Sequence, residues 1–422
     1  MSILVAEHLI DDMNEREREI AQRCEDILPG IAANAAAADR DGEFPLANIP
    51  LLSEAGLLGL MAPEAYGGLG GGLRDWSAVS FALGTVCPST GLAYFFHNTS
   101  ASRGNLALSA LEEGMFSDDE APKVKAFAGK VLNTMGRDGK WLANYASESV
   151  KSEHSAITIT TQAKQVDGGW LLNGVKSFGC ATGVADRYLV TASLEGIDDA
   201  GSLCTFFVER DAPGVRGRME WDALGMRGTA TEGLVLEDVF VADDNALAIP
   251  GAFARSCRMS RSGFVGNQVA ASVIYLGAAH AVYHATIKHL REKKFADSGR
   301  PIGTGPFQQQ LVGQMYADLM TATLWAQRQI RIESGTDVEK DEVIQFWRTC
   351  KGQVAEYSFK VSQAALKCAG TSGTLFGTPH SRALRDLAMG LVQAFPAERG
   401  RLQTAQMLIE GEEQQSFGTV KG

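Results

Sequence analysis

The sequence predicts an α+β protein in which a central β-domain separates two helical regions. Two changes along the chain indicate this order. Helical apolar spacing gives way to short β-branched and aromatic runs near residue 141, and helical spacing returns near residue 251. A chain of 422 residues can form roughly two to three domains. We therefore expect an N-terminal helical domain over residues 1–140, a central β-domain over 141–250 and a C-terminal helical bundle over 251–422.

The first region is rich in alanine and leucine, and Pro45, Pro63 and Pro88 mark breaks between its helices. Its last segment, 112–138, carries both acidic and basic side chains and has two interpretations, a solvated loop or the border of a substrate mouth. The central region contains strand-like runs at 157–161, 170–172, 188–192, 203–208 and 234–241. The tripeptide Asp-Gly-Gly at 167–169 predicts a hairpin turn.

Two long apolar stripes at helical spacing dominate the last region. The first consists of Phe307, Leu311, Met315, Leu319, Ala322, Ala326 and Ile330. The second consists of Val343, Phe346, Trp347, Cys350, Val354, Tyr357, Val361, Ala364 and Cys368. A short acidic segment joins them, which predicts an antiparallel helix pair in a bundle. The stripes offer more apolar surface than one domain face needs, so we expect a homo-oligomer, specifically a tetramer.

Composition excludes several classes of protein. The net charge is −11 and no block of Lys or Arg is long enough to follow a phosphate backbone, which argues against a nucleic-acid partner. The uncharged stretches 76–102 and 262–287 contain Pro, Asn, Gln and His, so we expect buried helices and no membrane span. Seven scattered Cys without a C-x-x-C pair favour a reduced, cytoplasmic protein without a metal site, and the acidic N-terminus argues against a signal peptide.

Local motifs leave the function open. The glycines at 67–72 fit a phosphate loop less well than a plain loop, because no strand precedes them and no Lys-Ser/Thr follows. His280 and His284 have metal-ligand spacing but no neighbouring Cys or carboxylate, so ordinary polar positions are the better interpretation. Three segments suit a ligand surface: 145–152, rich in hydroxyls; 178–183, an aromatic followed by small residues; and 368–373, a helix end.

Four motifs in order resemble the acyl-CoA dehydrogenase family. They are PEAYGGLG at 63–70, DGGWLLNGVK at 167–176, LGMRGTATEGLVLED at 224–238, and the spacing of Gly370, Gly373, Pro379 and Arg385-Asp386. The resemblance covers essentially the whole chain. It implies a β-barrel-like or β-sandwich central domain, a C-terminal four-helix bundle and FAD held between them, and it makes 67–72 a family turn.

The resemblance also implies which β-domain residues contact the flavin. Ser147 stands where the family has a Thr that hydrogen-bonds the ring, with Tyr145 and Ser152 beside it in the hydroxyl-rich segment. Phe178 replaces the family's Trp against the isoalloxazine. Cys180 replaces a Thr whose hydroxyl bonds flavin N5, and a thiol is a much weaker donor.

The second half of the chain supplies the implied contacts to the rest of FAD. Arg291, or Lys293 in its place, is near the family's Arg that reaches a neighbouring subunit's pyrophosphate. Lys367 replaces a Gln on the adenosine half, and Gly370 and Thr371 would offer backbone contacts.

The family's catalytic Glu is absent from both of its usual positions, which fall on Ala394 and Gly266. Glu398, about one helical turn beyond Ala394, is a weak candidate for the base and matches a family position on the adenine side of FAD. Three functions follow. The first is α,β-desaturation of an acyl-CoA or acyl-carrier-protein thioester, with hydride passing to flavin N5 and electrons to an electron-transfer flavoprotein or oxygen. The second is flavin-dependent monooxygenation or another flavin chemistry, although Gln393 replaces a His frequent in such monooxygenases. The third is a catalytically inactive flavin- or acyl-binding protein.

Overall fold

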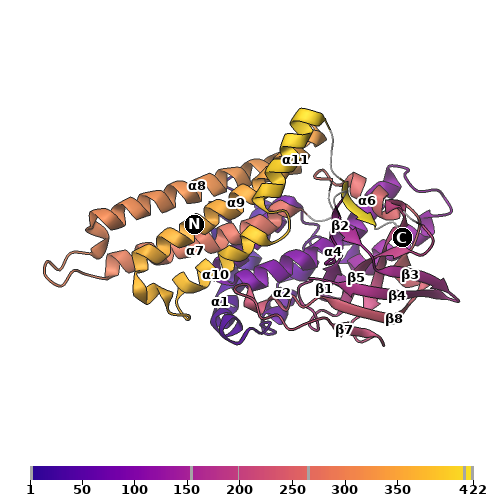
Figure 1. Ribbon diagram of the computed structural model, residues 1–422, viewed down its shortest axis with the longest axis horizontal. Coiled ribbons are helices and arrows are strands. Elements are labelled where there is room, and N and C mark those ends of the chain that lie inside the picture. The colour runs from indigo at the N-terminus through magenta and orange to yellow at the C-terminus, as the bar shows by residue number, and fades with distance from the viewer. Residues whose placement is uncertain (1–2, 153–154, 198, 264–266, 412–414, 420–422) are drawn as a thin grey trace.

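The computed structural model describes residues 3–152, 155–197, 199–263, 267–411 and 415–419. Helices, β-domain and bundle follow one another as expected (Figure 1). The N-terminal helices are α1 (Glu15–Asp41), α2 (Asn48–Glu54), α3 (Leu73–Val86), α4 (Pro88–Glu112) and α5 (Ala121–Gly136). The C-terminal helices are α6 (Ala252–Met259), α7 (Gln268–Glu292), α8 (Pro306–Ser334), α9 (Lys340–Ala369), α10 (Pro379–Val392) and α11 (Ala397–Glu410).

Local sequence explains several helix boundaries. Asn14 caps α1 by accepting a hydrogen bond from the Glu17 N–H, and Glu17 bonds back to the Asn14 N–H. Gly42 ends this helix with a left-handed φ of 72°. Pro88, Pro306 and Pro379 occupy first turns, where a missing N–H costs nothing.

The segment 112–138, for which a solvated loop and the border of a substrate mouth were the two interpretations, contains the helix α5. Its buried side chains fall at helical spacing and are Val124, Phe127, Ala128, Val131, Leu132 and Met135. The lysines of this segment lie on the solvent side of that stripe or at its edge, so the charges hid a regular amphipathic pattern.

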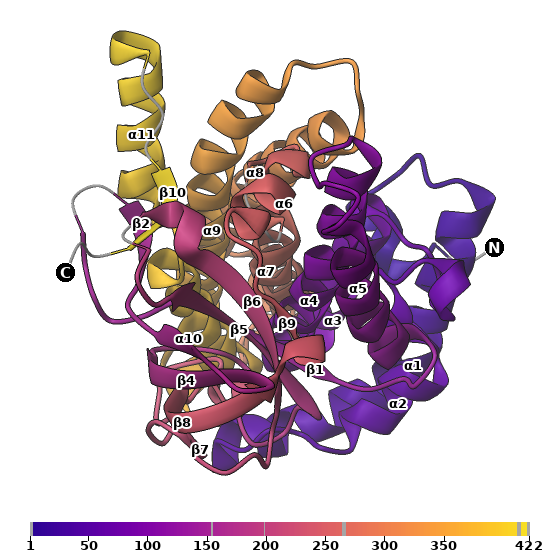
Figure 2. The same cartoon turned by 90° about the vertical axis from the view of Figure 1, so that its right-hand side faces the viewer.

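The middle of the chain forms one curled mixed sheet. Its strands are β1 (Leu142–Tyr145), β3 (Gln162–Val166), β4 (Gly169–Lys176), β5 (Arg187–Leu194), β6 (Leu203–Glu209), β7 (Val215–Gly217), β8 (Leu234–Ala242) and β9 (Ala246–Leu247). The order is β7-β8-β4-β3-β5-β6-β9, and β1 also pairs with β5. The predicted hairpin turn joins β3 to β4, with Gly168 at a φ of 72°. A separate pair unites β2 (Ser155–Ile159) with β10 (Gln415–Thr419), as Figure 2 shows.

Helices α7 to α10 form the bundle, and the two stripes lie on α8 and α9 as predicted. Trp325 of α8 stacks on Phe346 of α9 with ring centroids 4.8 Å apart. Helix α3 packs against α7 through two glycines, since a Cβ on Gly277 would overlap the Phe81 carbonyl oxygen and a Cβ on Gly84 that of Ile274. The N-terminal helices and the bundle therefore share one core.

Helices α3 and α4 contain most of the first uncharged stretch and α7 contains residues 268–287 of the second, and most side chains of these helices are buried. Over the residues that the structure describes, none of the helices combines the length and apolarity that crossing a bilayer requires. His280 and His284 lie in contact on α7, but no group of ligands suited to a metal ion occurs in the same described ranges.

Candidate flavin site

Two loops of the β-domain pair through their backbones and hold three residues in a strained conformation. Ala181 donates its N–H to Thr229 O at 2.9 Å, and Thr182 donates to Ala230 O at 3.0 Å. Ala181, Met226 and Ala230 have φ values of 63°, 52° and 46°, in the left-handed region that L-residues avoid. Each such residue costs about 1 kcal/mol or more and persists at functional sites where the surrounding structure enforces it. These paired loops, 178–183 and 226–231, mark the candidate site.

Phe178 offers an open aromatic face beside them. Its side chain lies at the end of β4 and is 49% exposed, although it is large and apolar. Trp221 meets the ring edge-on at 6.1 Å, and the Arg218 guanidinium lies 5.7 Å from its centroid. Ser147 is next to it, because its carbonyl accepts the Ser177 N–H at 2.9 Å. An exposed ring with a half-buried hydroxyl beside it suits a flat, polar-edged cofactor.

Cys180 is a buried, neutral thiol. Its Sγ lies 3.0 Å from Thr231 Oγ1, which in turn donates to Thr229 Oγ1 at 2.8 Å. Burial raises the pKa of the Cys180 thiol to about 12, so the group stays protonated at neutral pH. Because Thr231 gives its only hydroxyl proton to Thr229, the S–H of Cys180 donates to Thr231 in this structure and would have to turn away from it to bond a cofactor.

Tyr145 is a core residue. Its hydroxyl is 2.7 Å from Thr182 Oγ1, its ring meets Tyr188 edge-on, and none of the side chain is exposed. A Cβ on Gly179 would overlap the Tyr145 ring, so the tyrosine shapes the loop from beneath. The Tyr145 hydroxyl is hydrogen-bonded to Thr182, so the structure shows a supporting position for Tyr145 beneath the loop. Ser152, the other predicted hydroxyl, is half-buried in the segment leading to β2.

A buried ion pair fixes the segment after β1 that carries Ser147, and sequence reasoning missed it. Lys176 Nζ is 2.6 Å from Glu148 Oε1, and both side chains are essentially unexposed. Burial alone would raise the pKa of Glu148, but the Lys176 ammonium and the hydrogen bonds of Thr160 and Thr161 leave it below its usual value. Glu148 belongs to the segment 145–152 and Lys176 to the motif at 167–176, but nothing in the sequence shows that the two side chains form an ion pair.

The second loop docks on the bundle through Arg385-Asp386. Asp386 Oδ1 accepts the Met226 N–H at 2.6 Å, and burial raises the pKa of this carboxyl to about 6. Gly225 allows the contact, since a Cβ there would overlap the Arg385 carbonyl. Arg385 itself pairs with Asp39 of α1 at 2.5 Å. Three parts of the chain therefore meet at one end of the paired loops.

The segment that follows α10 contains Ala394, which the resemblance predicts to be the family's base position. Ala394 is exposed, Gln393 accepts a hydrogen bond from the Tyr275 hydroxyl at 3.1 Å, and Phe395 has a left-handed φ of 55°. The Phe395 ring meets Trp347 edge-on at 5.0 Å. Lys351, also missed from sequence, donates from beneath to the carbonyls of Gly390 and Gln393.

No carboxylate pairs with Lys351 over the residues that the structure describes, and burial lowers the pKa of its ammonium to about 7. Gly266, the alternative base position, lies outside the described residues. Glu398 is exposed on the first turn of α11 and faces α9 across a hollow of about 400 Å³.

The remaining predicted cofactor residues lie at the far end of the bundle. Lys367 is on the last turn of α9, Gly370 ends that helix at a φ of 65°, and Thr371 follows. Arg291 is on the last turn of α7, whose His289 ring is 6.1 Å from that of His380 at the start of α10. All four residues are exposed. In Figure 1 this end of the bundle points away from the β-domain, so one chain does not bring the two sets together.

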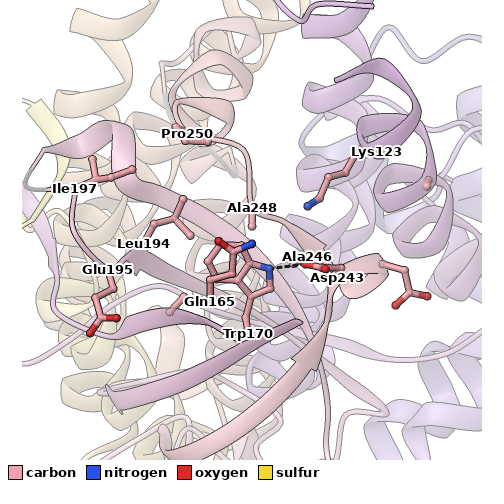
Figure 3. A pocket seen from close by; sticks show the side chains of 13 residues that line it. Lys123, Gln165, Trp170, Leu194, Glu195, Ile197, Asp243, Ala246, Ala248 and Pro250 are labelled. Carbon is pink, nitrogen blue, oxygen red and sulfur yellow. Dashed lines mark hydrogen bonds between the residues drawn. The ribbon is translucent and has the colours of Figure 1, made fainter. Parts of the chain in front are cut away.

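A separate pocket of about 770 Å³ opens between the β-domain and α5 (Figure 3). Lys123 reaches toward it from α5, and Trp170 lies beneath with its Nε1–H donated to Asp243 at 3.0 Å. None of the sequence-predicted site residues lines this pocket.

Comparisons with known proteins agree with this geometry. Family models described as the N-terminal, middle and C-terminal domains of acyl-CoA dehydrogenase match residues 14–113, 144–239 and 269–395. A mitochondrial isovaleryl-CoA dehydrogenase of Oryza sativa subsp. japonica is 27% identical over 411 residues, which cover 96% of this chain and 93% of that protein.

Solved structures share the fold. Butyryl-CoA dehydrogenase from Megasphaera elsdenii aligns with a TM-score of 0.76 at 18% identity, covering 94% of this chain and 99% of that one. FMN-bound TdsC, a dibenzothiophene monooxygenase from Paenibacillus sp. A11-2, aligns with a TM-score of 0.78 at 18% identity, covering 94% and 98%. With three consecutive domain matches in the family's order, the chain belongs to the acyl-CoA dehydrogenase family of flavin-dependent oxidoreductases.

Proposed function

We propose that the protein is an FAD-dependent oxidoreductase that introduces a Cα–Cβ double bond into an acyl thioester. The observation that carries this proposal is the pair of strained loops with Phe178 open beside them and Asp386 joining them to the segment of Ala394. Three of the five non-glycine residues with positive φ in the described part of the chain, Ala181, Met226 and Ala230, lie in these paired loops. The curated relatives at 26–27% identity, several of them named as acyl-CoA dehydrogenases, support the same substrate class.

The residues present fit a flavin ring. Phe178 would pack against it, the Ser147 hydroxyl would bond its polar edge, and the Cys180 thiol would face it as a weak donor. FAD, when bound, supplies the two-electron acceptor that takes the β-hydrogen of the substrate. The buried pair Glu148–Lys176 keeps Ser147 in position, and Lys351 keeps the segment before Ala394 in position.

We further propose that a second copy of the chain completes the cofactor site. Arg291, Lys367, Gly370 and Thr371 are exposed at the end of the bundle that points away from Phe178, which is where a neighbour's FAD could be reached. A tetramer built as a dimer of dimers is the proposed assembly. The carrier is proposed to be CoA or an acyl carrier protein, and the acceptor an electron-transfer flavoprotein or oxygen. The described cysteines are all free, which supports a reducing compartment such as the cytoplasm.

A monooxygenase is the second candidate, and two observations favour it. Ala394 supplies no acid, and Cys180 replaces a hydroxyl donor with a thiol held neutral by burial. Both changes weaken a proton-abstracting, hydride-transferring site, whereas reaction with oxygen does not depend on an acid at that position. The fold accommodates both chemistries and does not decide between them.

One experiment separates these candidates. The purified protein, loaded with FAD, is mixed without oxygen with a panel of acyl-CoAs while flavin absorbance is followed; oxygen is then admitted and products are identified by mass. We expect the protein to purify with FAD and some acyl-CoA to bleach the flavin, yielding an enoyl product. An oxygenated product would favour the monooxygenase. A colourless protein that cannot bind added FAD, or bound FAD that no substrate reduces, would indicate an inactive binding protein.

A further inference from the structure

Arg103 is a buried cation with unpartnered donors. It lies on α4 with a side chain only 5% exposed. Its Nη2 donates to Asn144 Oδ1 at 3.0 Å and to Thr191 Oγ1 at 3.1 Å. Its Nε and Nη1 have no hydrogen-bond partner anywhere in the described part of the chain. A guanidinium stays charged at neutral pH, so one N–H on Nε and two on Nη1 are buried without an acceptor.

Neighbouring charges do not neutralise Arg103. Lys176 Nζ binds the carbonyl of Thr191, the residue whose hydroxyl Arg103 also contacts. The acid of this cluster, Glu148, already accepts hydrogen bonds on both oxygens, from Lys176, Thr160 and Thr161. Two cations and one carboxylate leave a net positive charge in the core. Burying an unpaired charge is strongly unfavourable unless another group compensates it.

Arg255 shows how the same chain pairs the charge of an arginine elsewhere, although the Nε of Arg255 also has no hydrogen-bond partner among the described residues. Its guanidinium lies 4.2 Å from the Phe116 ring centroid, as that of Arg103 lies 4.8 Å from Phe253. Arg255, however, donates to both carboxylate oxygens of Glu120, at 2.9 and 3.2 Å. The contrast shows that, among the residues the structure describes, no acid accepts from Nε and Nη1 of Arg103, and a bound ligand can supply one.

The surroundings of Arg103 lead to the candidate flavin site. Phe253 belongs to an apolar cluster that contains Trp347 and Phe395, and Phe395 directly follows Ala394. Ala146, the neighbour of Ser147, packs against the same cluster. An acyl group that reaches Ala394 and Ser147 therefore borders the cluster on which Arg103 rests.

We propose that Arg103 binds a carboxylate at the distal end of the substrate's acyl group, so that the protein selects acyl thioesters ending in an acid over those ending in a methyl group. This inference rests on the proposed function and names its substrate class. A carboxylate fits better than a phosphate, because the partner of a side chain that is 5% exposed must also leave water, and a single charge loses less hydration than a multiple one.

The test compares succinyl-, glutaryl-, adipoyl- and suberoyl-CoA with neutral acyl-CoAs of equal carbon number. Because each pair carries the same CoA, a difference in binding reports only on the terminal carboxylate. Dissociation constants are measured with the FAD-loaded protein, its Arg103→Met and Arg103→Lys variants, and Arg255→Met as the matched control. Thermal stability is measured for each protein without ligand and with free adipate.

We expect at least one acid to bind about tenfold or more tightly than its neutral match, a preference that Arg103→Met abolishes, Arg103→Lys retains in part and Arg255→Met leaves unchanged. Without ligand, Arg103→Met should be as stable as the parent or more so, since it removes an uncompensated buried charge. A merely structural Arg103 would instead give a less stable variant with unaltered ligand preference, and that result would overturn the inference.

The two proposals fail separately. If neutral acyl-CoAs bind and bleach the flavin but no acid is preferred, desaturation stands and the carboxylate site is refuted. If no CoA ester binds, but adipate stabilises the parent and not Arg103→Met, the proposed carboxylate site is supported and the proposed acyl thioester substrate is refuted.

Discussion

Cys180 places a thiol where the resemblance implies a threonine hydroxyl. The exchange of oxygen for sulfur sets the strength of the hydrogen bond that residue 180 can donate to the flavin. We predict that Cys180→Thr strengthens that hydrogen bond by about 1 kcal/mol, which raises the two-electron potential of bound FAD by on the order of 20 mV. Spectroelectrochemical titration would measure the shift, with Cys368→Thr in the bundle as a control. Equal potentials for both variants and the parent would show that residue 180 does not face the ring.

Ala394 decides between the two leading chemistries. If the protein is a dehydrogenase, Ala394→Glu should raise the rate of flavin reduction by acyl-CoA about a hundred- to ten-thousand-fold, the usual worth of a general base. The gain should increase with pH through the pKa of the new carboxyl, because only the carboxylate accepts a proton. Ala394→Gln, similar in size but not basic, is the control. No reduction at any pH with FAD still bound would move the monooxygenase to first place.

Individual residues show what a sequence reveals and what it hides. The open ring of Phe178 and the left-handed cap at Gly370 lie in segments whose composition suggested a ligand surface. The hydroxyl of Tyr145 is used inside the core, because its partner Thr182 comes from another loop. The sequence does not single out Arg103 or Lys351, because what distinguishes them is that no carboxylate of the described residues pairs with them, and only the packing shows this.

Among the elements, α4 is tied to its neighbours by His97. Its Nδ1 accepts the Leu142 N–H of β1 at 3.0 Å, so the proton is on Nε2, which donates to Leu58 O at 2.7 Å. Burial lowers the pKa of His97 from 6.5 to about 4. The folded state therefore resists the imidazolium, and this contribution to stability is complete above pH 6.5 and is lost as pH falls toward 4.

We predict that the free energy of unfolding falls across this window by up to about 1.4 kcal/mol per pH unit more for the parent than for His97→Gln, which can form both hydrogen bonds without titrating. Denaturant titrations at several pH values would measure the difference, in which all other titrating groups cancel. Parallel curves for the two proteins would show that His97 is not the source.

Long elements were predictable and short ones were not. In the stripes of α8 and α9, many apolar positions independently indicate the same helical face. Strands β1, β3, β7 and β9 have five residues or fewer, and β3 reads Gln-Ala-Lys-Gln-Val, so their pairing partners decide their structure. In α5, the lysines made the segment resemble a solvated loop, although its buried residues follow a regular helical spacing.

At the scale of the whole molecule, we propose that the two halves of the FAD site belong to different copies of the chain. We predict that the protein sediments as a tetramer and not as a 45.1 kDa monomer at micromolar concentration. Two variants sharpen this: Phe178→Asp damages one half-site and Lys367→Glu the other, and each alone should lose FAD. Co-expressed, they should recover FAD in about half of the sites of mixed dimers, because one site then has two intact halves.

No recovery in purified mixed dimers would place each FAD within a single chain.

The order of helices, sheet and bundle was predictable, because the residue pattern changes sharply along the sequence from helical apolar spacing to β-branched runs and back. The contact of Asp39, Met226 and Arg385-Asp386 was not predictable, because it joins residues from all three regions. Gly225 permits this contact because it has no Cβ, but in the sequence it is only one glycine of the motif at 224–238.

The pairing of β10 with β2 has a consequence for how the chain folds. Gln415 aligns with Ser155, about 260 positions away, so this contact closes a very long loop and gains little from local structure. It should form only after the sheet and the bundle have brought the two segments together, as the last step of the folding pathway. Pulsed hydrogen exchange during refolding should therefore find the amides of β2 protected later than those of β4 and β5, and a chain caught before that step would expose an unpaired strand edge to its neighbours.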